Sequence, residues 1–542
     1  MMKKKFLFIN YIGPGPDIYN LYPDNGLALL AQVLINSGYG AKILDFCTVS
    51  CYKTFFKENK KKIDYLQSQI NMNILDFKNR NKIKQELSKI LLESEEGVIN
   101  QIFNEIKSFK PDFIGFKIWV GFGTPGSFRI AKRIKQKFPN IKIIGGGPQA
   151  GIFKEDIMKY APQFDYIIYG EGEESLPQLL SAIKSGHGFE KISSLIYNDG
   201  QIKVNLKGDY IDISKIPFPC YDTEVYPAMA EDKIKIFIFE ESRGCPNSCY
   251  FCIHPRKMGN RYRIRDINIV MQELELTSKK LTSKYFRIAG SNPPQKNILK
   301  LAKKIKGKGY TYSLFGHANM KTDFNLLKQS GCGAMFFGIE SGSPHILKNM
   351  IGKNILLDRL KENIAKSYDS GIYTAGTVII PTPMDTEETI EETIAFLQGL
   401  KVHSVTPGIP YLEPETLWWD NAEKLGFNFS NKKFLRKKLL LYEAFPPFDF
   451  LAEQLPYRIS NFSYEKMIDT RCRIIELMKL NGITHDIVDY TYLCAKAHGT
   501  DVIKFRDITD KILAEKDTEA LEDLVKTINK NLEVDYNKTA VL

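Results

Sequence analysis

The sequence lacks several features that would place the chain outside the ordinary soluble proteins. No apolar run reaches the length of about eighteen residues that a membrane-spanning helix needs, so no membrane partner is expected. The apolar stretch from Phe6 to Asn10 is too short for a signal-peptide core and fits a first buried strand. Nine cysteines in 542 residues, three of them in one tight cluster, do not form a disulfide framework. These absences favour a cytoplasmic protein in a reducing compartment.

A concentrated basic region is also missing. The net charge of +12 is modest for this length, and lysine and glutamate alternate widely along the chain. Nucleic acid is therefore not expected as a partner. The content of 43% hydrophobic and 25% charged residues is typical of a globular protein with several domains.

Short apolar segments alternate with helical patterns in the first part of the chain, which predicts a doubly wound parallel α/β sheet. A Lys-, Glu- and Asn-rich stretch near 52–110 interrupts the alternation and is interpreted as an exposed helical insertion. Residues 191–234 carry Gly, Asp and Pro punctuation and are interpreted as a linker with a few short strands. The expected strands are Phe6 to Asn10, Ala41 to Phe46, Asp112 to Ile118, Ile141 to Gly145 and Asp165 to Tyr169.

A second alternating series spans residues 235–427 and predicts a partial (β/α)6 barrel. Side chains at the carboxyl ends of such strands build active sites. From 428 to 542 no strand pattern is visible, and the spacing over Tyr464 to Leu480 and over Ile503 to Lys530 predicts a helical C-terminal domain. The expected barrel strands are Lys235 to Glu240, Lys284 to Ala289, Tyr310 to Phe315, Ala334 to Glu340, Tyr373 to Ile380 and Ser404 to Ile409.

Three thiols with C-x3-C-x2-C spacing follow the first barrel strand, at Cys245, Cys249 and Cys252. Thiolates are the usual ligands of iron–sulfur clusters. Three of them bind three irons of a [4Fe–4S] cubane and leave the fourth iron open to an exchangeable ligand, which a catalytic cluster requires. A structural zinc site is the alternative, with His254 as a fourth ligand.

This motif and its placement resemble the radical S-adenosylmethionine (SAM) superfamily. The resemblance implies that the open iron binds the amino and carboxylate groups of SAM and that an electron from the cluster cleaves SAM to a 5′-deoxyadenosyl radical. It also implies a backbone contact from Phe251 to adenine and contacts from Glu340 or Ser341 to the ribose or methionine portion. Gly290 and Ser291 stand where the family often has Gly-Gly-Glu, and the acidic residue of that motif is absent.

Four glycine-rich loops follow strands of the first sheet, where open α/β sheets bind ligands. Their order and spacing resemble the cobalamin-binding domain in front of many radical SAM barrels, which assigns residues 1–190 to cobalamin. The histidine motif Asp-x-His-x-x-Gly of other cobalamin domains is absent, so no histidine from this domain is expected as the lower cobalt ligand. The resemblance implies cobalamin contacts from Asn25, Gly26, Leu27, Gly121, Gly123, Thr124, Gly146, Gly147, Gln149, Gly170, Glu171 and Gly172.

The resemblance favours a methyltransferase that moves a methyl group from SAM through methylcobalamin. The acceptor would be an unactivated carbon or a phosphinate phosphorus of a small-molecule or peptide substrate. An external flavodoxin- or ferredoxin-like protein would supply electrons. Three alternatives stay open: a cobalamin-dependent radical SAM enzyme that forms or contracts a ring without methyl transfer, a cobalamin sensor or carrier with a vestigial barrel, and an enzyme that kept the fold but lost cobalamin. The intact cysteine triad argues against the sensor.

Overall fold

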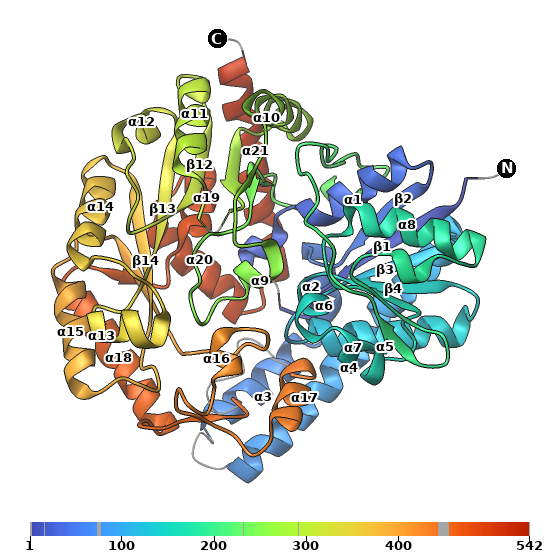
Figure 1. The fold of residues 1–542 in the computed structure, drawn as a ribbon, viewed down its shortest axis with the longest axis horizontal. Helices are drawn as coiled ribbons and strands as arrows, with labels where there is room; N and C mark the ends of the chain where they lie inside the picture. Colours follow the sequence, from blue (N-terminus) through green and yellow to red (C-terminus); the bar gives the residue numbers. More distant parts are fainter. Residues whose placement is uncertain are drawn as a thin grey trace.

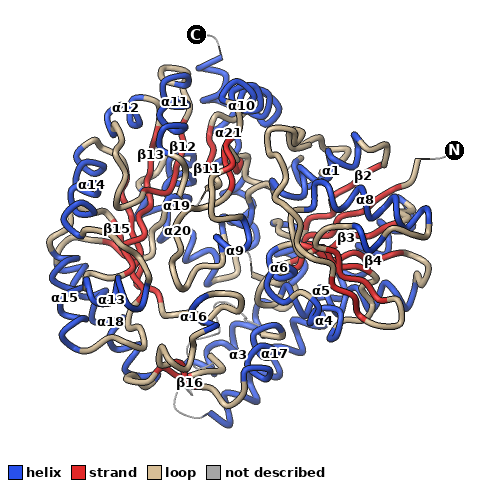
Figure 2. The backbone as a smooth tube through the Cα atoms, viewed as in Figure 1, coloured by secondary structure: helices blue, strands red, loops and turns tan. Residues whose placement is uncertain are grey.

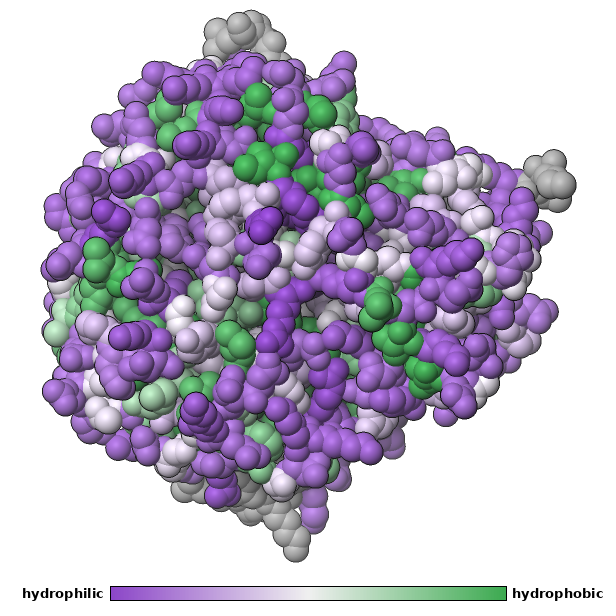
Figure 3. Space-filling model, in the orientation of Figure 1, coloured by the Kyte–Doolittle hydropathy of each residue, from purple (hydrophilic) through white to green (hydrophobic). Residues whose placement is uncertain are grey.

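A computed structural model describes residues 3–15, 17–72, 77–230, 232–290, 292–442 and 455–540. Two sheets form the two halves of the molecule, one built from the N-terminal third of the chain and one from its middle (Figures 1 and 2). The helices within residues 489–540 lie between the halves and contact both of them, whereas the helix over 464–480 packs on the outside of the barrel half. The face seen in Figure 3 is mostly hydrophilic, with hydrophobic side chains in separate patches. None of the described helices is long and apolar enough to cross a bilayer.

The N-terminal sheet has seven strands in the order β2-β1-β3-β4-β5-β6-β7, with the first five parallel. All five expected parallel strands are confirmed. The linker contributes the last two strands, which pair antiparallel and cover the edge of the sheet. The strands are β1 Lys5–Tyr11, β2 Gly40–Asp45, β3 Phe113–Ile118, β4 Lys142–Gly146, β5 Tyr166–Ile168, β6 Leu195–Asn198 and β7 Ile202–Val204.

Helices cover both faces of this sheet, with α1 and α8 packed together on one face. Asp24 caps α1, because its side chain accepts a hydrogen bond of 2.9 Å from the backbone N–H of Leu27. The helices of the unit are α1 Asn25–Asn36, α2 Val49–Phe56, α3 Lys60–Met72, α4 Phe77–Phe109, α5 Gly123–Lys137, α6 Pro148–Phe153, α7 Glu155–Tyr160 and α8 Gly172–Ser185, with the 3-10 turns η1 Ile18–Leu21 and η2 Phe189–Lys191.

The segment near 52–110 is helical, as expected, but the expectation that it is exposed is wrong. Helix α4 packs on α2 and α5, and its apolar residues recur at helical spacing and are buried. Glu95 on α4 is 2% exposed and accepts hydrogen bonds from the Tyr11 hydroxyl (2.8 Å) and from Arg129 of α5 (2.8 Å). The many lysines and glutamates of α4 lie on its solvent side, and they make the row of buried apolar residues hard to recognise in the sequence. The segment is therefore the crossover between β2 and β3.

The barrel sheet also has seven strands, all parallel, in the order β18-β15-β14-β13-β12-β11-β8. The six expected strands are confirmed as β8 Phe237–Phe239, β11 Tyr285–Ile288, β12 Thr311–Gly316, β13 Cys332–Glu340, β14 Tyr373–Ile379 and β15 Ser404–Gly408. The elements between them are β9 Ser242–Arg243, β10 Arg263–Ile264, α9 His254–Met258, α10 Ile267–Leu281, α11 Gln295–Ile305, α12 Phe324–Gln329, α13 Pro344–Ile346, η4 Leu347–Ile351, α14 Leu357–Asp369 and α15 Glu387–Gln398, and η3 Pro227–Met229 precedes β8.

The C-terminal region departs from a purely helical unit. Its strand β18 pairs with β15 and adds the seventh barrel strand. The helix expected over Ile503 to Lys530 is two helices, whereas the helix over Tyr464 to Leu480 is confirmed. The elements are α16 Leu417–Asp420, α17 Lys432–Leu440, α18 Tyr464–Leu480, α19 Asp489–His498, α20 Val502–Ala514, α21 Thr518–Ala540, β16 Phe427–Asn428, β17 Arg458–Ile459 and β18 Thr484–His485.

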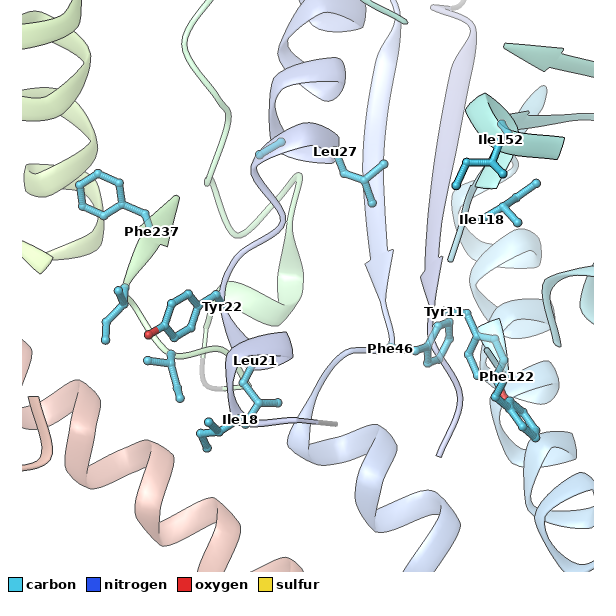
Figure 4. Packing of buried hydrophobic residues seen from close by; sticks show 14 of the residues in the cluster. Tyr11, Ile18, Leu21, Tyr22, Leu27, Phe46, Ile118, Phe122, Ile152 and Phe237 are labelled. Atoms are coloured by element: carbon cyan, nitrogen blue, oxygen red, sulfur yellow. The ribbon is translucent and has the colours of Figure 1, made fainter. Parts of the chain in front are cut away.

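Helix α19 joins the two halves. It packs against β11, β12, β13 and β14, and its first residue, Asp489, is 2% exposed and binds Arg287 of β11 at 2.8 Å. From the N-terminal half, the Tyr22 hydroxyl reaches the backbone carbonyl of Tyr490 at 3.2 Å. Tyr22 projects toward the strand that carries Phe237 (Figure 4). The C-terminal region therefore holds the sheets in a common orientation.

Candidate functional site

One cavity of about 770 Å³ lies where the two sheets meet. Its walls come from the carboxyl ends of β1, β3, β4 and β5 and from the start of α1. The barrel contributes residues of β8, β11 and α9, and α19 contributes Tyr490. A cavity of this size with walls from two domains is a typical ligand site.

Most of the residues assigned to cobalamin line this cavity. The lining ones are Asn25, Gly26, Leu27, Gly146, Gly147, Gly170, Glu171 and Gly172. Gly121, Gly123, Thr124 and Gln149 are not among the residues that line it.

The β3–α5 loop faces the cavity through other residues than those expected. The Thr124 hydroxyl donates a hydrogen bond to the Trp119 carbonyl, which turns the loop back on itself. Lys117 and Trp119 line the cavity instead. The Trp119 ring N–H donates to Asn10 at 2.7 Å, and the Lys117 ammonium lies 4.3 Å from the Trp119 ring centroid while it pairs with Asp24. The sequence signal for these residues is their place at the end of a parallel strand.

Much of the cavity wall is apolar and suits a large organic cofactor. Phe6, Phe8, Leu30, Ile144 and Leu176 contribute to it, all from the sheet face that α1 and α8 cover or from those helices. The glycines that line it leave the backbone accessible. A methyl group built on Gly146 would have no neighbour closer than 3.6 Å, and Gly147 adopts a φ of +94°, a conformation that side chains disfavour. These features fit the corrin and the nucleotide tail of a B12 cofactor.

The cysteine loop begins at the end of β8 and is fixed by backbone contacts. Gly244 has a φ of +92°, and a Cβ there would lie 2.1 Å from the Arg261 carbonyl oxygen, so only glycine fits. The backbone N–H of Cys245 donates to the Gly259 carbonyl at 3.0 Å. The N–H of Cys252 donates to the Cys249 carbonyl at 3.1 Å, which curls the loop around the thiols.

The three thiols share a half-buried environment. Burial raises the pKa of Cys249 to about 11 and the pKa of Cys252 to about 12, and the neighbouring thiols add to both shifts. A metal would be needed to hold them as thiolates, since coordination deprotonates a thiol outright. Among the described residues no three Cys, His, Asp or Glu side chains converge on a single ion. The protein ligands of a [4Fe–4S] cubane are thiolates, and three thiols of one loop that influence each other's pKa form a donor set that fits it.

The other residues assigned to SAM lie around this loop. Gly290 follows β11, and Ser291 lies outside the described residues. The Phe251 ring packs 5.7 Å from that of the buried Trp418. Glu340 ends β13 with a φ of +65°, and its Oε1 pairs with Lys353 at 2.7 Å, which leaves Oε2 for a ligand.

Ser341 makes contacts inside the protein. It is 2% exposed, and its hydroxyl lies 3.2 Å from the hydroxyl of Thr393 on α15. The same oxygen accepts the backbone N–H of Ser343 at 3.1 Å. Of the two candidates for the SAM ribose or methionine portion, Glu340 is the one with a side-chain atom left to bind it.

A buried network of charges joins the cysteine loop to the first sheet. Arg243, two residues before Cys245, binds Glu171 at 3.2 Å and also binds Glu173 and Glu240. Arg263 binds both oxygens of Glu171 at 2.9 and 2.7 Å. Burial opposes ionisation of Glu171, but the hydrogen bonds from Arg263 and the charge of Arg243 lower its pKa. Glu171 lines the cavity, and it also connects the loop between β5 and α8 to the cysteine loop.

Comparisons with known proteins agree with this division. Residues 240–397 match the radical SAM superfamily, and residues 83–180 match the B12 binding domain. The chain is 28% identical over 340 residues to the uncharacterized methyltransferase PH0819 of Pyrococcus horikoshii, covering 61% of this chain and 73% of that protein. It is 26% identical over 314 residues to the anaerobic magnesium-protoporphyrin IX monomethyl ester cyclase of Rubrivivax gelatinosus, covering 54% of this chain and 55% of that protein.

The fold is shared with a solved structure over nearly the whole chain. The radical SAM methyltransferase TsrM of Kitasatospora setae, with cobalamin and a [4Fe–4S] cluster bound, superposes with a TM-score of 0.64. The match covers 95% of this chain and 99% of that one at 15% identity. Two parts of the chain thus match the radical SAM superfamily and the B12 binding domain, and the resemblance drawn from the sequence is confirmed.

Proposed function

We propose that this protein is a cobalamin-dependent radical SAM methyltransferase that methylates an unactivated carbon or a phosphinate phosphorus of a small molecule or peptide. The carrying observation is one cavity whose walls come from both sheets. Arg243, Lys257 and Met258 of the cysteine-loop region line the same space as Gly146 and Gly170 of the first sheet. A substrate in this space would contact both cofactor sites at once.

Each part of the chain has a separate task in this proposal. Residues 1–190 bind cobalamin, residues 235–427 bind the cluster and SAM, residues 191–234 link these two parts, and residues 428–542 hold them together. Cys245, Cys249 and Cys252 ligate three irons. When bound, the cluster supplies the electron that cleaves SAM, and cobalamin carries the methyl group between SAM and substrate. The electrons come from a flavodoxin- or ferredoxin-like donor, in the cytoplasm.

The residues of the chain bind and orient the cofactors and the substrate, and they exclude water from the reaction. The apolar wall around Phe6 and Phe8 holds the nucleotide tail of cobalamin, and the glycines that line the cavity admit the corrin to the backbone. Oε2 of Glu340 accepts a hydrogen bond from a SAM hydroxyl or ammonium group. The network of Arg243, Glu171 and Arg263 sets the distance between the cluster loop and the cavity. Chemistry between the two sites then proceeds out of contact with water.

The test uses anaerobically reconstituted protein, reduced cobalamin and SAM that carries a deuterated methyl group. We expect S-adenosylhomocysteine to form already without substrate. With substrate, we expect a deuterated methyl product and equal amounts of S-adenosylhomocysteine and 5′-deoxyadenosine. The similarity to a ring-forming cyclase keeps oxidative ring formation or ring contraction as the second candidate. Accumulation of 5′-deoxyadenosine without S-adenosylhomocysteine or labelled product would favour that candidate.

A further inference from the structure

Helix α17 is held to the protein by one side and exposes lysines on the other. Leu435 and Leu439 are buried, and Arg436 pairs with Asp156 of α7 and donates to the Ile152 carbonyl at 2.8 Å. In the described part of the chain, every ion pair of α17 involves this arginine. The lysines of the helix are all exposed, and the helix contains no acidic residue. They are Lys432, Lys433, Lys437 and Lys438.

Two exposed aromatic rings lie among these lysines. Phe434 is 51% exposed and Tyr160 of α7 is 36% exposed. The Lys438 ammonium lies 5.4 Å from the Phe434 ring centroid, and the Lys437 ammonium lies 5.4 Å from the Tyr160 ring centroid. An apolar, aromatic centre with a charged rim is the usual composition of a protein–protein interface. The α17 face is defined here as these four residues together with Lys433.

The charges of the α17 face are unfavourable for the helix that carries them. Lys432 and Lys433 stand in the first turn, where the helix dipole stabilises acidic side chains and destabilises basic ones. Lys433 and Lys437 are four residues apart, so their like charges repel each other on one side of the helix. A partner with an acidic surface would compensate both effects. The arrangement therefore favours an acidic partner over a bare solvated surface.

Two tryptophans of α16 connect α17 to the cysteine loop. The ammonium group of the first lysine of α17 lies 5.3 Å from the Trp419 ring centroid. The backbone N–H of Trp418 donates to the Tyr250 carbonyl at 2.8 Å, and its ring lies 5.7 Å from that of Phe251. Tyr250 and Phe251 stand between the second and third cysteines of the loop. Figure 1 shows α16 between α9 and α17, so a partner on α17 would lie near the cluster ligands.

We propose that the α17 face docks the small acidic electron-transfer protein, a flavodoxin or a ferredoxin, that reduces the cluster. This inference rests on the proposed function, which needs electrons from outside the chain, and it adds the surface where the donor binds. The lysines pair with carboxylates of the donor, and Phe434 and Tyr160 contact its apolar surface. One electron passes from the reduced donor to the oxidised cluster, so the donor loses one electron and the cluster gains it. Electron transfer falls steeply with distance, which is why the donor must dock close to the cysteine loop.

The experiment measures docking and turnover separately, with the full chain carrying its cluster and cobalamin. The probes are an acidic flavodoxin and an acidic ferredoxin. Calorimetric titration gives the affinity of each probe independently of turnover. The rate of 5′-deoxyadenosine formation is measured with the reduced probe and with titanium(III) citrate, a small reductant that needs no docking surface. We expect at least one probe to bind, and its affinity to fall with added salt, because salt screens exposed charges.

A triple charge reversal on α17 is compared with an equal reversal on α11, whose lysines are also exposed and which lies at the other end of the molecule (Figure 1). We expect the α17 variant to raise the dissociation constant and the half-saturating concentration of the donor about a hundredfold. Its rate with titanium(III) citrate, its iron content and its circular dichroism should match the wild type, and the α11 variant should match the wild type in every measurement. The substitutions are Lys433→Glu, Lys437→Glu and Lys438→Glu on α17, and Lys296→Glu, Lys300→Glu and Lys303→Glu on α11.

Three outcomes would overturn the inference. One is that neither probe binds. Another is that both triple variants weaken binding equally, which would mean that net charge and not the α17 face attracts the donor. The third is that the α17 variant keeps its affinity for the probes but loses affinity for duplex DNA, which would make the face a nucleic-acid surface.

The failure of this inference is distinguishable from the failure of the proposed function. If titanium(III) citrate drives normal formation of S-adenosylhomocysteine and 5′-deoxyadenosine, the methyltransferase proposal stands and only the docking surface is wrong. If no S-adenosylhomocysteine forms with titanium(III) citrate, the proposed function itself fails, and the calorimetric titration still decides whether the donor binds to α17.

Discussion

The two sheets of this molecule acquire their last strands from different parts of the sequence, although both contribute the carboxyl ends of strands to the shared cavity. The N-terminal sheet ends with β6 and β7, which are the next two strands after β5 in the sequence. The barrel sheet instead receives β18 and α19 from a region about eighty residues beyond β15 (Thr484 against Ser404). The N-terminal sheet, whose last strands are close in sequence, should bind its cofactor whether or not the barrel has bound its own. A sheet completed by remote contacts depends on the C-terminal region for its shape.

The largest expected effect is the loss of the iron–sulfur cluster from the barrel while the first sheet still binds cobalamin. Replacement of Cys245, Cys249 and Cys252 by Ala should abolish the bound iron, about four per chain in a cubane, together with SAM cleavage. Cobalamin binding should persist, because its walls lie mainly in the first sheet. Iron analysis and absorption spectra after anaerobic reconstitution measure both. The exposed Cys472→Ala is the control. Retention of zinc without iron in the wild-type protein would restore the zinc alternative.

The second prediction tests the dependence of the barrel on its remote helix. Asp489→Ala leaves the Arg287 guanidinium without its carboxylate, and the Ser313 hydroxyl also loses its acceptor. Loss of one partner of a buried ion pair costs about 3–5 kcal/mol. We expect the thermal midpoint of the barrel to fall, as measured by calorimetry. The double variant Arg287→Leu, Asp489→Leu should regain much of the loss, and an unchanged midpoint in Asp489→Ala would contradict the role of α19.

The third prediction tests the cavity of the first sheet. Gly146→Leu places a bulky side chain where the open backbone meets the cavity, and we expect cobalamin to bind about a hundredfold more weakly, or about 2.7 kcal/mol. Gly146→Ala is the matched control, since its Cβ meets nothing closer than 3.6 Å. Absorbance titration with cobalamin gives the affinity, and iron content should stay normal. Equal affinities for the two variants would place cobalamin elsewhere.

The smallest effect concerns Glu241, a carboxyl at the end of β8 that is 1% exposed. Burial raises its pKa from 4.5 to about 7, so the folded chain binds this proton more tightly than the unfolded chain does. Its contribution to stability is therefore complete below about pH 4.5 and is lost as the pH rises through about 7. Glu241→Gln should stabilise the barrel by about 2 kcal/mol at pH 8 and make no difference near pH 4. Thermal midpoints of the wild type and the variant between pH 4 and pH 8 test this prediction. A larger stabilisation at low pH than at high pH would contradict the raised pKa of Glu241.

The sequence by itself determined the five parallel strands of the first sheet, six strands of the barrel sheet, the cysteine loop and the resemblance to the radical SAM superfamily. Strand–helix alternation is a local pattern, and the spacing of Cys245, Cys249 and Cys252 is local as well, so both are readable without tertiary contacts. The α4 crossover was recognisable as a helix, but the surplus of charged residues concealed its buried stripe. The two-residue strand β18 carries too little pattern to be detected.

Only the tertiary structure decided which loop residues reach the cavity and which charges find partners there. Loop glycines show that a turn is possible, but only the folded loop, in which Thr124 donates a hydrogen bond to the Trp119 carbonyl, shows that Lys117 and Trp119 line the cavity. Ion pairing depends on residues far apart in the sequence. Glu171 meets Arg243 and Arg263 across 72 and 92 residues, and Arg287 meets Asp489 across 202 residues. The physical reason is that packing brings side chains within a few ångströms regardless of their separation along the chain, and sequence patterns carry only local order.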